Sequence, residues 1–200
     1  MDSNRIRPGL PDLAASAEAA HGRLCDWRGG SWYRITGYDG LAPFLTTLVS
    51  DCDLWLYVAS TGGLTAGRSI PSQALFPYET VDRLFRSHTH TGPLTVLRIH
   101  DGDHIRMWEP FADDGRLRYE LRRALYKHEL GCELWFEEHN VSLGITFRYG
   151  WRPSRHFGWV RTCELVNGGQ TPLTVEILDG VRNLMPAGVE KELQDAFSCL

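Results

Sequence analysis

The sequence predicts an all-β fold in which two antiparallel sheets pack as a sandwich, with a short N-terminal arm and a C-terminal helix. From Trp27 onward, short apolar or alternating runs are separated by Gly, Asp, Asn and Pro, which is the pattern of strands and turns. The runs follow one another closely, which favours antiparallel sheets over a wound α/β fold. The 200 residues are 42% hydrophobic and 23% charged, which suits one globular domain.

Residues 1–26 are rich in Ala, Pro and charged side chains, and we interpret them as a partly flexible arm. The run "LAASAEAAHGRL" within them is compatible with one short helix. The sandwich domain is expected over residues 27–188. Residues 189–200 have helical composition and are expected to begin a further helix.

Between these ends, eight to eleven strands are expected. The readable strands cover residues 31–38, 43–50, 54–60, 93–100, 104–110, 132–139, 141–151, 157–167 and 172–180. The clearest is 141–151, where every second residue from Val141 to Trp151 is apolar and those between are small or polar. Asp101-Gly102-Asp103 joins two of the strands as a hairpin-type turn. The segment 115–131 fits both a strand and a helix, and its neighbours favour a strand.

The segment Ser60–Tyr78, "STGGLTAGRSIPSQALFPY", contains three glycines and two prolines and has no regular apolar period. Glycine permits a close approach to the backbone, and the planar guanidinium of Arg68 suits an anion or a sugar hydroxyl. One interpretation is therefore a binding loop. The other is a cover for one end of the sandwich, with its aromatic side chains in the core.

Composition argues against several classes of protein. The net charge is −4 and no basic stripe occurs, so the sequence predicts no nucleic-acid partner. The five cysteines form no CxxC pair, which indicates reduced thiols and a cytoplasmic location. No apolar run reaches the roughly 18 residues of a membrane span, so no membrane partner is expected.

Metal binding and catalysis have weak signals. Histidines that strand pairing could bring together are His88, His90, His100 and His104. The spacing of a cupin-type metal site is missing, so we favour hydrogen-bonded histidines and expect no metal or other cofactor. Carboxylates occur at Asp51, Asp53, Glu109, Glu137, Glu138 and Asp179. Glu137 and Glu138 are adjacent in a strand and must point to opposite faces, so they cannot form a glycosidase pair. No catalytic residue is predicted, and Cys163 is interpreted as structural.

Tryptophans give the remaining signal. Trp108 ends a strand in "MWEPF" and is followed by Glu109. An aromatic ring beside planar polar groups is the combination that sugar sites use, because the ring takes the C–H side and the polar groups take the hydroxyls. The residues predicted to bind sugar are Arg68, Trp108, Glu109 and Arg161. Core packing is the alternative role for any one tryptophan.

Taken together, four stretches resemble the N-terminal domain of large bacterial proteins of the cellobiose-phosphorylase-like group. They are "STGGLTAGR…ALFPY", "TGPLTVLRIHDGDHIRMWEPF", "GCELWFEEHNVSLGITFRYGW" and "RHFGWVRTCELVNGGQTPLTVEILDGVRNLMPAG", and they span roughly residues 31–188. The resemblance implies a galactose-mutarotase-like β-supersandwich joined by a linker helix, starting at residue 189, to a C-terminal helical barrel. It also implies that the catalytic acid lies in that barrel, and that the sandwich supports the barrel, joins subunits into a homodimer and lends loops to the rim of a sugar site.

Three functions follow as hypotheses. The first is a non-catalytic, carbohydrate-associated module that binds an oligosaccharide within a glycan-active protein. The second is a stand-alone mutarotase- or lyase-like enzyme that uses His and Glu as acid and base. The third is a purely structural oligomerisation domain. An enzyme should have a pocket in which a histidine and a carboxylate converge, whereas a supporting module should not.

Overall fold

The computed structural model describes residues 5–7, 19–186, 188 and 191–197. The strands are β1 (Arg5–Arg7), β2 (His21–Trp27), β3 (Gly30–Thr36), β4 (Leu45–Leu48), β5 (Leu54–Ala59), β6 (Leu64–Arg68), β7 (Gly92–Asp101), β8 (His104–Trp108), β9 (Leu121–His128), β10 (Leu134–Asn140), β11 (Ile145–Ser154), β12 (Gly158–Asn167) and β13 (Thr174–Arg182). The helices are α1 (Val81–Ser87) and α2 (Lys191–Phe197), with short 3-10 turns η1 (Tyr38–Gly40), η2 (Pro71–Gln73) and η3 (Gly115–Leu117).

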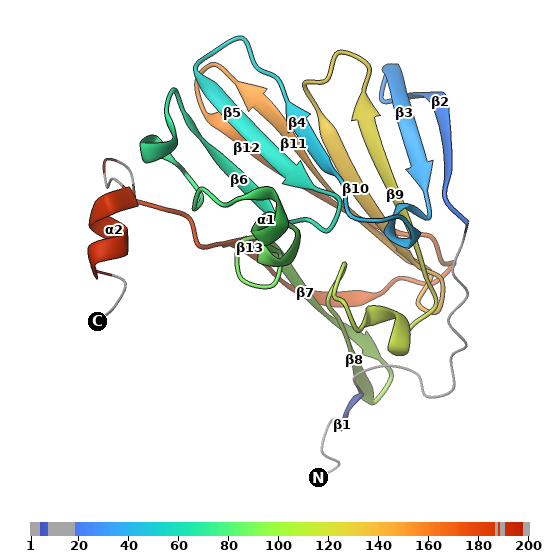
Figure 1. The fold of residues 1–200 in the computed structure, drawn as a ribbon. Coiled ribbons are helices and arrows are strands. Elements are labelled where there is room, and N and C mark those ends of the chain that lie inside the picture. Colours follow the sequence, from blue (N-terminus) through green and yellow to red (C-terminus); the bar gives the residue numbers. More distant parts are fainter. Residues whose placement is uncertain (1–4, 8–18, 187, 189–190, 198–200) are drawn as a thin grey trace.

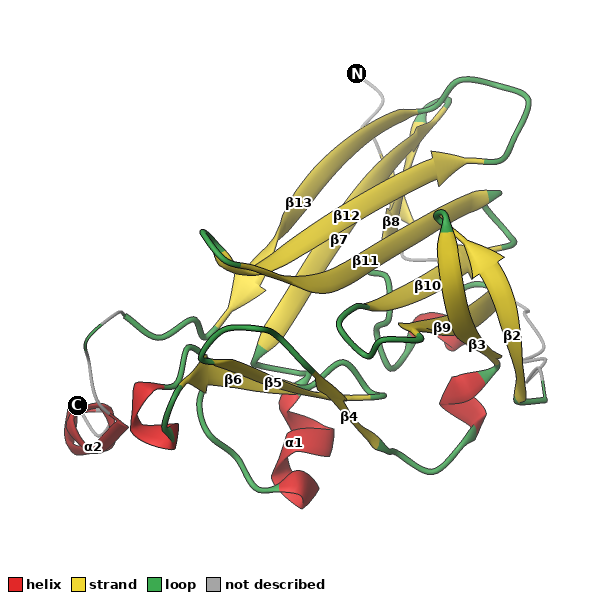
Figure 2. Ribbon diagram, turned by 90° about the horizontal axis from the view of Figure 1, so that it is seen from above, coloured by secondary structure: helices red, strands yellow, loops and turns green. Residues whose placement is uncertain are grey.

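These strands form three sheets (Figures 1 and 2). Sheet A has the order β1-β8-β7-β13, sheet B has the order β12-β11-β10-β9-β3-β2, and sheet C has the order β4-β5-β6. All pairs are antiparallel except β1 with β8. In Figure 1, sheet B lies above sheet A, and sheet C lies in front of the left part of sheet B. The predicted all-β sandwich is therefore confirmed, although sheet C is an addition that the sequence did not indicate.

One apolar core joins the three sheets. Leu56 of sheet C, Leu97 of sheet A and Phe136 of sheet B are each at most 1% exposed and belong to the same cluster. Burying such apolar side chains is the main term that stabilises the fold. Strand β11 shows the predicted alternation, because its odd-numbered residues from Ile145 to Trp151 lie in this core. The strand begins at residue 145 rather than 141, after a turn at Gly144, which has a φ of +66°.

The predicted strands all occur with shifts of a few residues at their ends, and the ambiguous segment 115–131 contains strand β9 after η3. Strand β1 pairs with β8, although it lies within residues 1–26, which the sequence predicts to be a partly flexible arm. Three further elements differ from the expectation. Strand β2 begins at His21, so residues 21–26 of the predicted arm belong to sheet B. Of the helix predicted over 13–24, residues 21–24 lie in this strand and 13–18 lie outside the described residues. Helix α1 was not predicted, although Thr80 at its N-cap and Asp82 in its first turn are typical helix-start residues.

The third difference is that Ser60–Tyr78 is not an irregular loop, because it contains strand β6 and the turn η2. Residues 64–67 are all buried, so the alternation that reveals a strand is absent. Gly67 is required by its cross-strand neighbour, since a Cβ there would lie 2.4 Å from the ring of Trp55. The glycine thus reflects strand packing and not a ligand.

At the other end of the chain, helix α2 lies inside the segment 189–200 that was expected to be helical. Within the described ranges, neither α1 nor α2 has the length and apolar character needed to cross a membrane.

Candidate functional site

A cleft with a volume of about 300 Å³ opens where three turns meet one end of sheets A and B. Its walls are the turn Thr61–Gly62, the turn His88–Thr89 and the loop Glu109–Asp114, and its floor includes Phe147 and Tyr149 of β11. The volume is at the lower end of the range of about 300–1,000 Å³ that small-molecule sites occupy. A smaller hollow of about 160 Å³ lies on the other side of Phe111 and shares Thr61 and Asp113 with the cleft.

The loop Glu109–Asp114 is held from below by Glu138 of β10, whose side chain has no exposed surface. The Glu138 carboxylate accepts hydrogen bonds from Trp108 Nε1 at 2.9 Å and from the backbone N–H of Phe111 at 3.0 Å. Arg123 Nε of β9 donates to the same carboxylate at 2.6 Å. A buried carboxylate is tolerated only when it is paired and hydrogen-bonded in this way.

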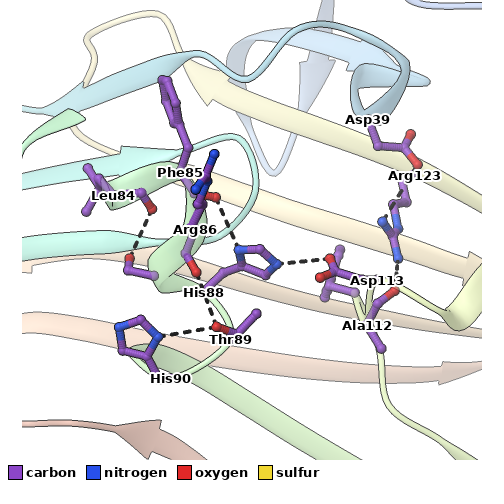
Figure 3. Close-up of polar contacts among 12 residues, drawn as sticks. Asp39, Leu84, Phe85, Arg86, His88, Thr89, His90, Ala112, Asp113 and Arg123 are labelled. Atoms are coloured by element: carbon purple, nitrogen blue, oxygen red, sulfur yellow. Dashed lines mark hydrogen bonds and ion pairs between the residues drawn. The ribbon is translucent and has the colours of Figure 1, made fainter. Parts of the chain in front are cut away.

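Arg123 completes the support of the loop. Its Nη2 donates to the carbonyl oxygen of Ala112 at 3.0 Å, and its Nη1 lies 3.7 Å from a carboxylate oxygen of Asp39 (Figure 3). Burial alone would lower the pKa of Arg123, but the charge and hydrogen bond of Glu138, together with Tyr38 and Asp39, outweigh that effect and raise the pKa. The guanidinium is therefore firmly charged and fixes the loop from the core side.

Phe111 has a φ of +66°, which is uncommon for a residue with a side chain. This conformation lets its backbone N–H reach Glu138 while its ring packs edge-on against Tyr149, with the ring centroids 5.3 Å apart. Holding a residue there costs about 1–3 kcal/mol, and such strain clusters at functional sites. The hydrogen bond to Glu138 offsets it.

His88, at the end of α1, connects the second wall to the loop. Its Nε2 lies 2.9 Å from a carboxylate oxygen of Asp113, and its Nδ1 lies 3.3 Å from the carbonyl oxygen of Phe85 (Figure 3). Both partners are acceptors, so each ring nitrogen already has a contact within the protein. Arg182 of β13 fixes the same turn by donating to the carbonyl oxygens of His88 and Thr89 at 2.6 and 2.8 Å.

Several polar groups of the cleft and the adjoining hollow have unused hydrogen-bonding capacity within the described part of the chain. Thr61 Oγ1, Arg182 Nε and one carboxylate oxygen of Asp39 are buried without a hydrogen-bond partner. Glu109 is exposed at the rim, and its carboxylate makes no hydrogen bond or ion pair with the described residues. The site therefore offers free acceptors, a free donor and a hydroxyl that can do both.

The structure separates the four residues that were predicted to bind sugar. Glu109 lines the cleft. Trp108 is 1% exposed and lies behind the loop, so its ring cannot stack on a ligand. Arg161 lies between the sheets, where it pairs with Asp179 at 2.7 Å and its guanidinium lies 5.3 Å from the ring centroid of Tyr149. Arg68 is exposed at the end of β6 and lines neither the cleft nor the hollow.

The sequence missed Thr61, Asp113 and Arg182 as site residues. Asp113 lies in "FADDG", which resembles any polar turn, and Arg182 ends a strand that gave no other signal. For His88 the sequence favours a hydrogen-bonded role over metal binding, but it does not single this residue out as part of a site. Among the described residues, no group of three or more His, Cys, Asp or Glu side chains lies close enough to hold a metal ion.

The interpretation of Cys163 as structural agrees with its surroundings. Burial, with a smaller contribution from the nearby charge of Asp179, raises the pKa of this thiol to about 12, which suppresses the reactive thiolate.

Comparison of the chain with protein-family models and with curated proteins found no match to either.

Proposed function

We propose that the protein is a non-catalytic, carbohydrate-associated β-sandwich module and that the cleft beside Glu109 holds the sugar. The observation that carries this proposal is a mixture of unused groups: an acceptor at Glu109, a donor at Arg182 and a hydroxyl at Thr61 in the cleft, and an acceptor at Asp39 in the adjoining hollow. Sugar hydroxyls both donate and accept, so they suit such a mixture better than an anion or a cation does.

The contacts of His88 favour a binding role over acid–base catalysis. His88 and Asp113 converge in the cleft, which is the arrangement expected of the alternative mutarotase- or lyase-like enzyme. However, both ring nitrogens of His88 already face acceptors. A proton transfer through His88 would require one of these contacts to break first.

The wider context of the proposal rests on the resemblance to cellobiose-phosphorylase-like proteins. It comprises a helical-barrel domain of the same chain that carries the catalytic acid, and a homodimer. The four described cysteines, Cys25, Cys52, Cys132 and Cys163, all carry free thiols, which supports the expected cytoplasmic location.

The test is a calorimetric or NMR titration of the full chain with a panel of neutral mono- and oligosaccharides. We expect saturable binding of at least one sugar, weakened by Thr61→Val, which keeps the shape and removes the hydroxyl, and by Glu109→Gln. Loss of one hydrogen bond predicts an affinity roughly 2–10-fold lower, and more for a bond to the charged Glu109. Arg68→Gln is the matched control and should leave the affinity unchanged.

Loss of binding in Arg68→Gln with no change in Thr61→Val or Glu109→Gln would refute the proposal that the sugar binds in the cleft. The enzyme alternative is tested separately, by following the interconversion of freshly dissolved sugar anomers by polarimetry. We expect no acceleration over the spontaneous rate; acceleration that His88→Gln abolishes would favour the enzyme.

A further inference from the structure

A second concave site lies on the opposite face of sheet B. It is a groove of about 310 Å³ across β3, β9, β10 and β11, and its lining includes Arg34, Arg122, Glu137, His139 and Arg148. The cleft has Phe147 and Tyr149 of β11 on its floor, whereas the groove is lined by Thr146 and Arg148, which alternate with them and point to the other face. The two sites therefore share a strand but no side chain.

The groove exists because short side chains are surrounded by long ones. Ala124 of β9 is paired with Thr36 on one side and with Glu137 on the other, and Thr146 is paired with His139. Ala124, Thr36 and Thr146 thus form a low floor in the middle of the sheet. The arginine side chains from the neighbouring positions rise around it.

Positive charge exceeds negative charge among the side chains of the groove. Among the lining residues, three guanidinium groups, those of Arg34, Arg122 and Arg148, face one carboxylate, that of Glu137. Outside the lining, Glu164 lies 3.9 Å from Arg148. Arg123 also lines the groove, but its guanidinium pairs with Glu138 on the cleft side of the sheet. This local excess stands out in a chain with a net charge of −4.

Glu137 cannot satisfy the donors that surround it. Its two oxygens already accept hydrogen bonds from Tyr126 at 3.1 Å and from Arg148 at 2.5 Å. Arg34 lies 3.5 Å from it without forming a hydrogen bond, and Arg34 Nε is buried with no partner among the described residues. Arg122 has a distant ion pair with Glu120, at 3.7 Å, and its side chain is 63% exposed.

Arg34 is also held in place before any ligand arrives. Its guanidinium lies 5.2 Å from the ring centroid of Tyr126, a cation–π contact. A fixed guanidinium with unused N–H groups is suited to the two oxygens of a carboxylate or phosphate, which it can bind side by side.

His139 Nδ1 contacts the hydroxyl of Thr146 at 2.9 Å, and its Nε2 has no hydrogen bond with the described residues. We propose that this groove binds a small oxyanion, a phosphate or a carboxylate group, through Arg34 with help from Arg122 and Nε2 of His139. The proposal does not depend on sugar binding in the cleft. The ligand supplies the acceptors that Glu137 lacks and balances the excess positive charge.

The test is an NMR titration of the full chain with inorganic phosphate and, separately, with acetate, at low and constant ionic strength. We expect saturable shifts of the backbone amides of Arg34, Ala124 and Thr146 with at least one probe. Binding should weaken at least about tenfold in Arg34→Gln and measurably in Arg122→Gln, whose exposed position leaves folding intact. It should not change in Arg83→Gln, which removes the same charge from a side chain of α1 that is 77% exposed.

A response to phosphate alone identifies a phosphate site, and a response to acetate alone identifies a carboxylate site. No saturable shift with either probe, or equal binding by the wild type, Arg34→Gln and Arg122→Gln, overturns the proposal.

Discussion

Replacing Glu138 with Gln should destabilise the protein by about 3–5 kcal/mol. Glu138 has no exposed surface, and its carboxylate oxygens accept hydrogen bonds from Trp108, Phe111 and Arg123. Glutamine keeps the volume, but its NH₂ group would face at least one of these donors. It also leaves the charge of Arg123, whose side chain is 12% exposed, without its closest partner. Losing one or two charge-assisted hydrogen bonds, at about 1.5–3 kcal/mol each, gives about 1.5–6 kcal/mol, which includes this range.

Urea unfolding at pH 7, followed by tryptophan fluorescence and circular dichroism, measures this change. The slope with urea should stay constant while the midpoint falls, since the surface exposed on unfolding is unchanged. Glu109→Gln makes the same chemical change at the exposed rim and should cost less than about 0.5 kcal/mol. A loss below about 1 kcal/mol for Glu138→Gln would refute the account of the buried pair.

A double variant tests whether the cost comes from the unpaired charge. Glu138→Met alone leaves Arg123 buried and uncompensated, whereas Glu138→Met combined with Arg123→Met removes both charges. Because apolar replacements of a whole buried pair are often tolerated, the double variant should be more stable than the sum of the single losses predicts. Simple additivity would show that the two side chains act independently.

Two further predictions concern packing and pH. Gly150→Ala should lower the free energy of unfolding by about 1–3 kcal/mol, measured by thermal unfolding, because the new Cβ would lie 2.2 Å from the Trp135 ring. Gly180→Ala is the control and should be close to neutral, because no atom lies within 4 Å of its new Cβ. Equal losses of stability in the two variants would contradict the predicted clash. Burial alone would raise the pKa of Asp179, but hydrogen bonds from Arg161 and Thr95 lower it in the folded state. The stability that ionised Asp179 contributes to the fold should therefore be complete above the ordinary carboxylate pKa of about 4. It should disappear as the pH falls through the lower pKa that Asp179 has in the folded protein. The difference in melting temperature between the wild type and Asp179→Asn should shrink between pH 6 and pH 3, and a difference that grows on acidification would contradict this sign.

The sequence predicts the strands well where one face is buried and the other is not. In β11, the alternation from Ile145 to Trp151 identifies both the strand and its core face. The sequence does not predict strand β6, because residues 64–67 are buried on both faces and the two-residue apolar period is absent. Helix α1 is only seven residues long, too short for a clear helical period.

The site was less predictable, because it depends on which segments meet. Trp108 and Glu109 are neighbours in the chain, yet one is in the core and the other at the rim of the cleft. The adjacency of Glu137 and Glu138 did predict that they point to opposite faces, which is confirmed by their different partners. That Glu138 would support the cleft loop could not be foreseen, because Arg123 and Phe111 reach it only after β9 and β10 are paired.

The two faces of β10 are similar in composition, and this has a consequence for how the register of the strand is set during folding. Each face carries one large aromatic ring and one glutamate, so a shift by a single residue would exchange Trp135 with Phe136 and Glu137 with Glu138. Hydrophobicity alone penalises that mistake only weakly. The correct register is therefore selected by contacts with the adjoining strands. Only in that register does Gly150 lie against the indole of Trp135, and only there does each glutamate pair with its own arginine. Misaligned folding of this sheet is thus opposed by shape and ion pairing between strands.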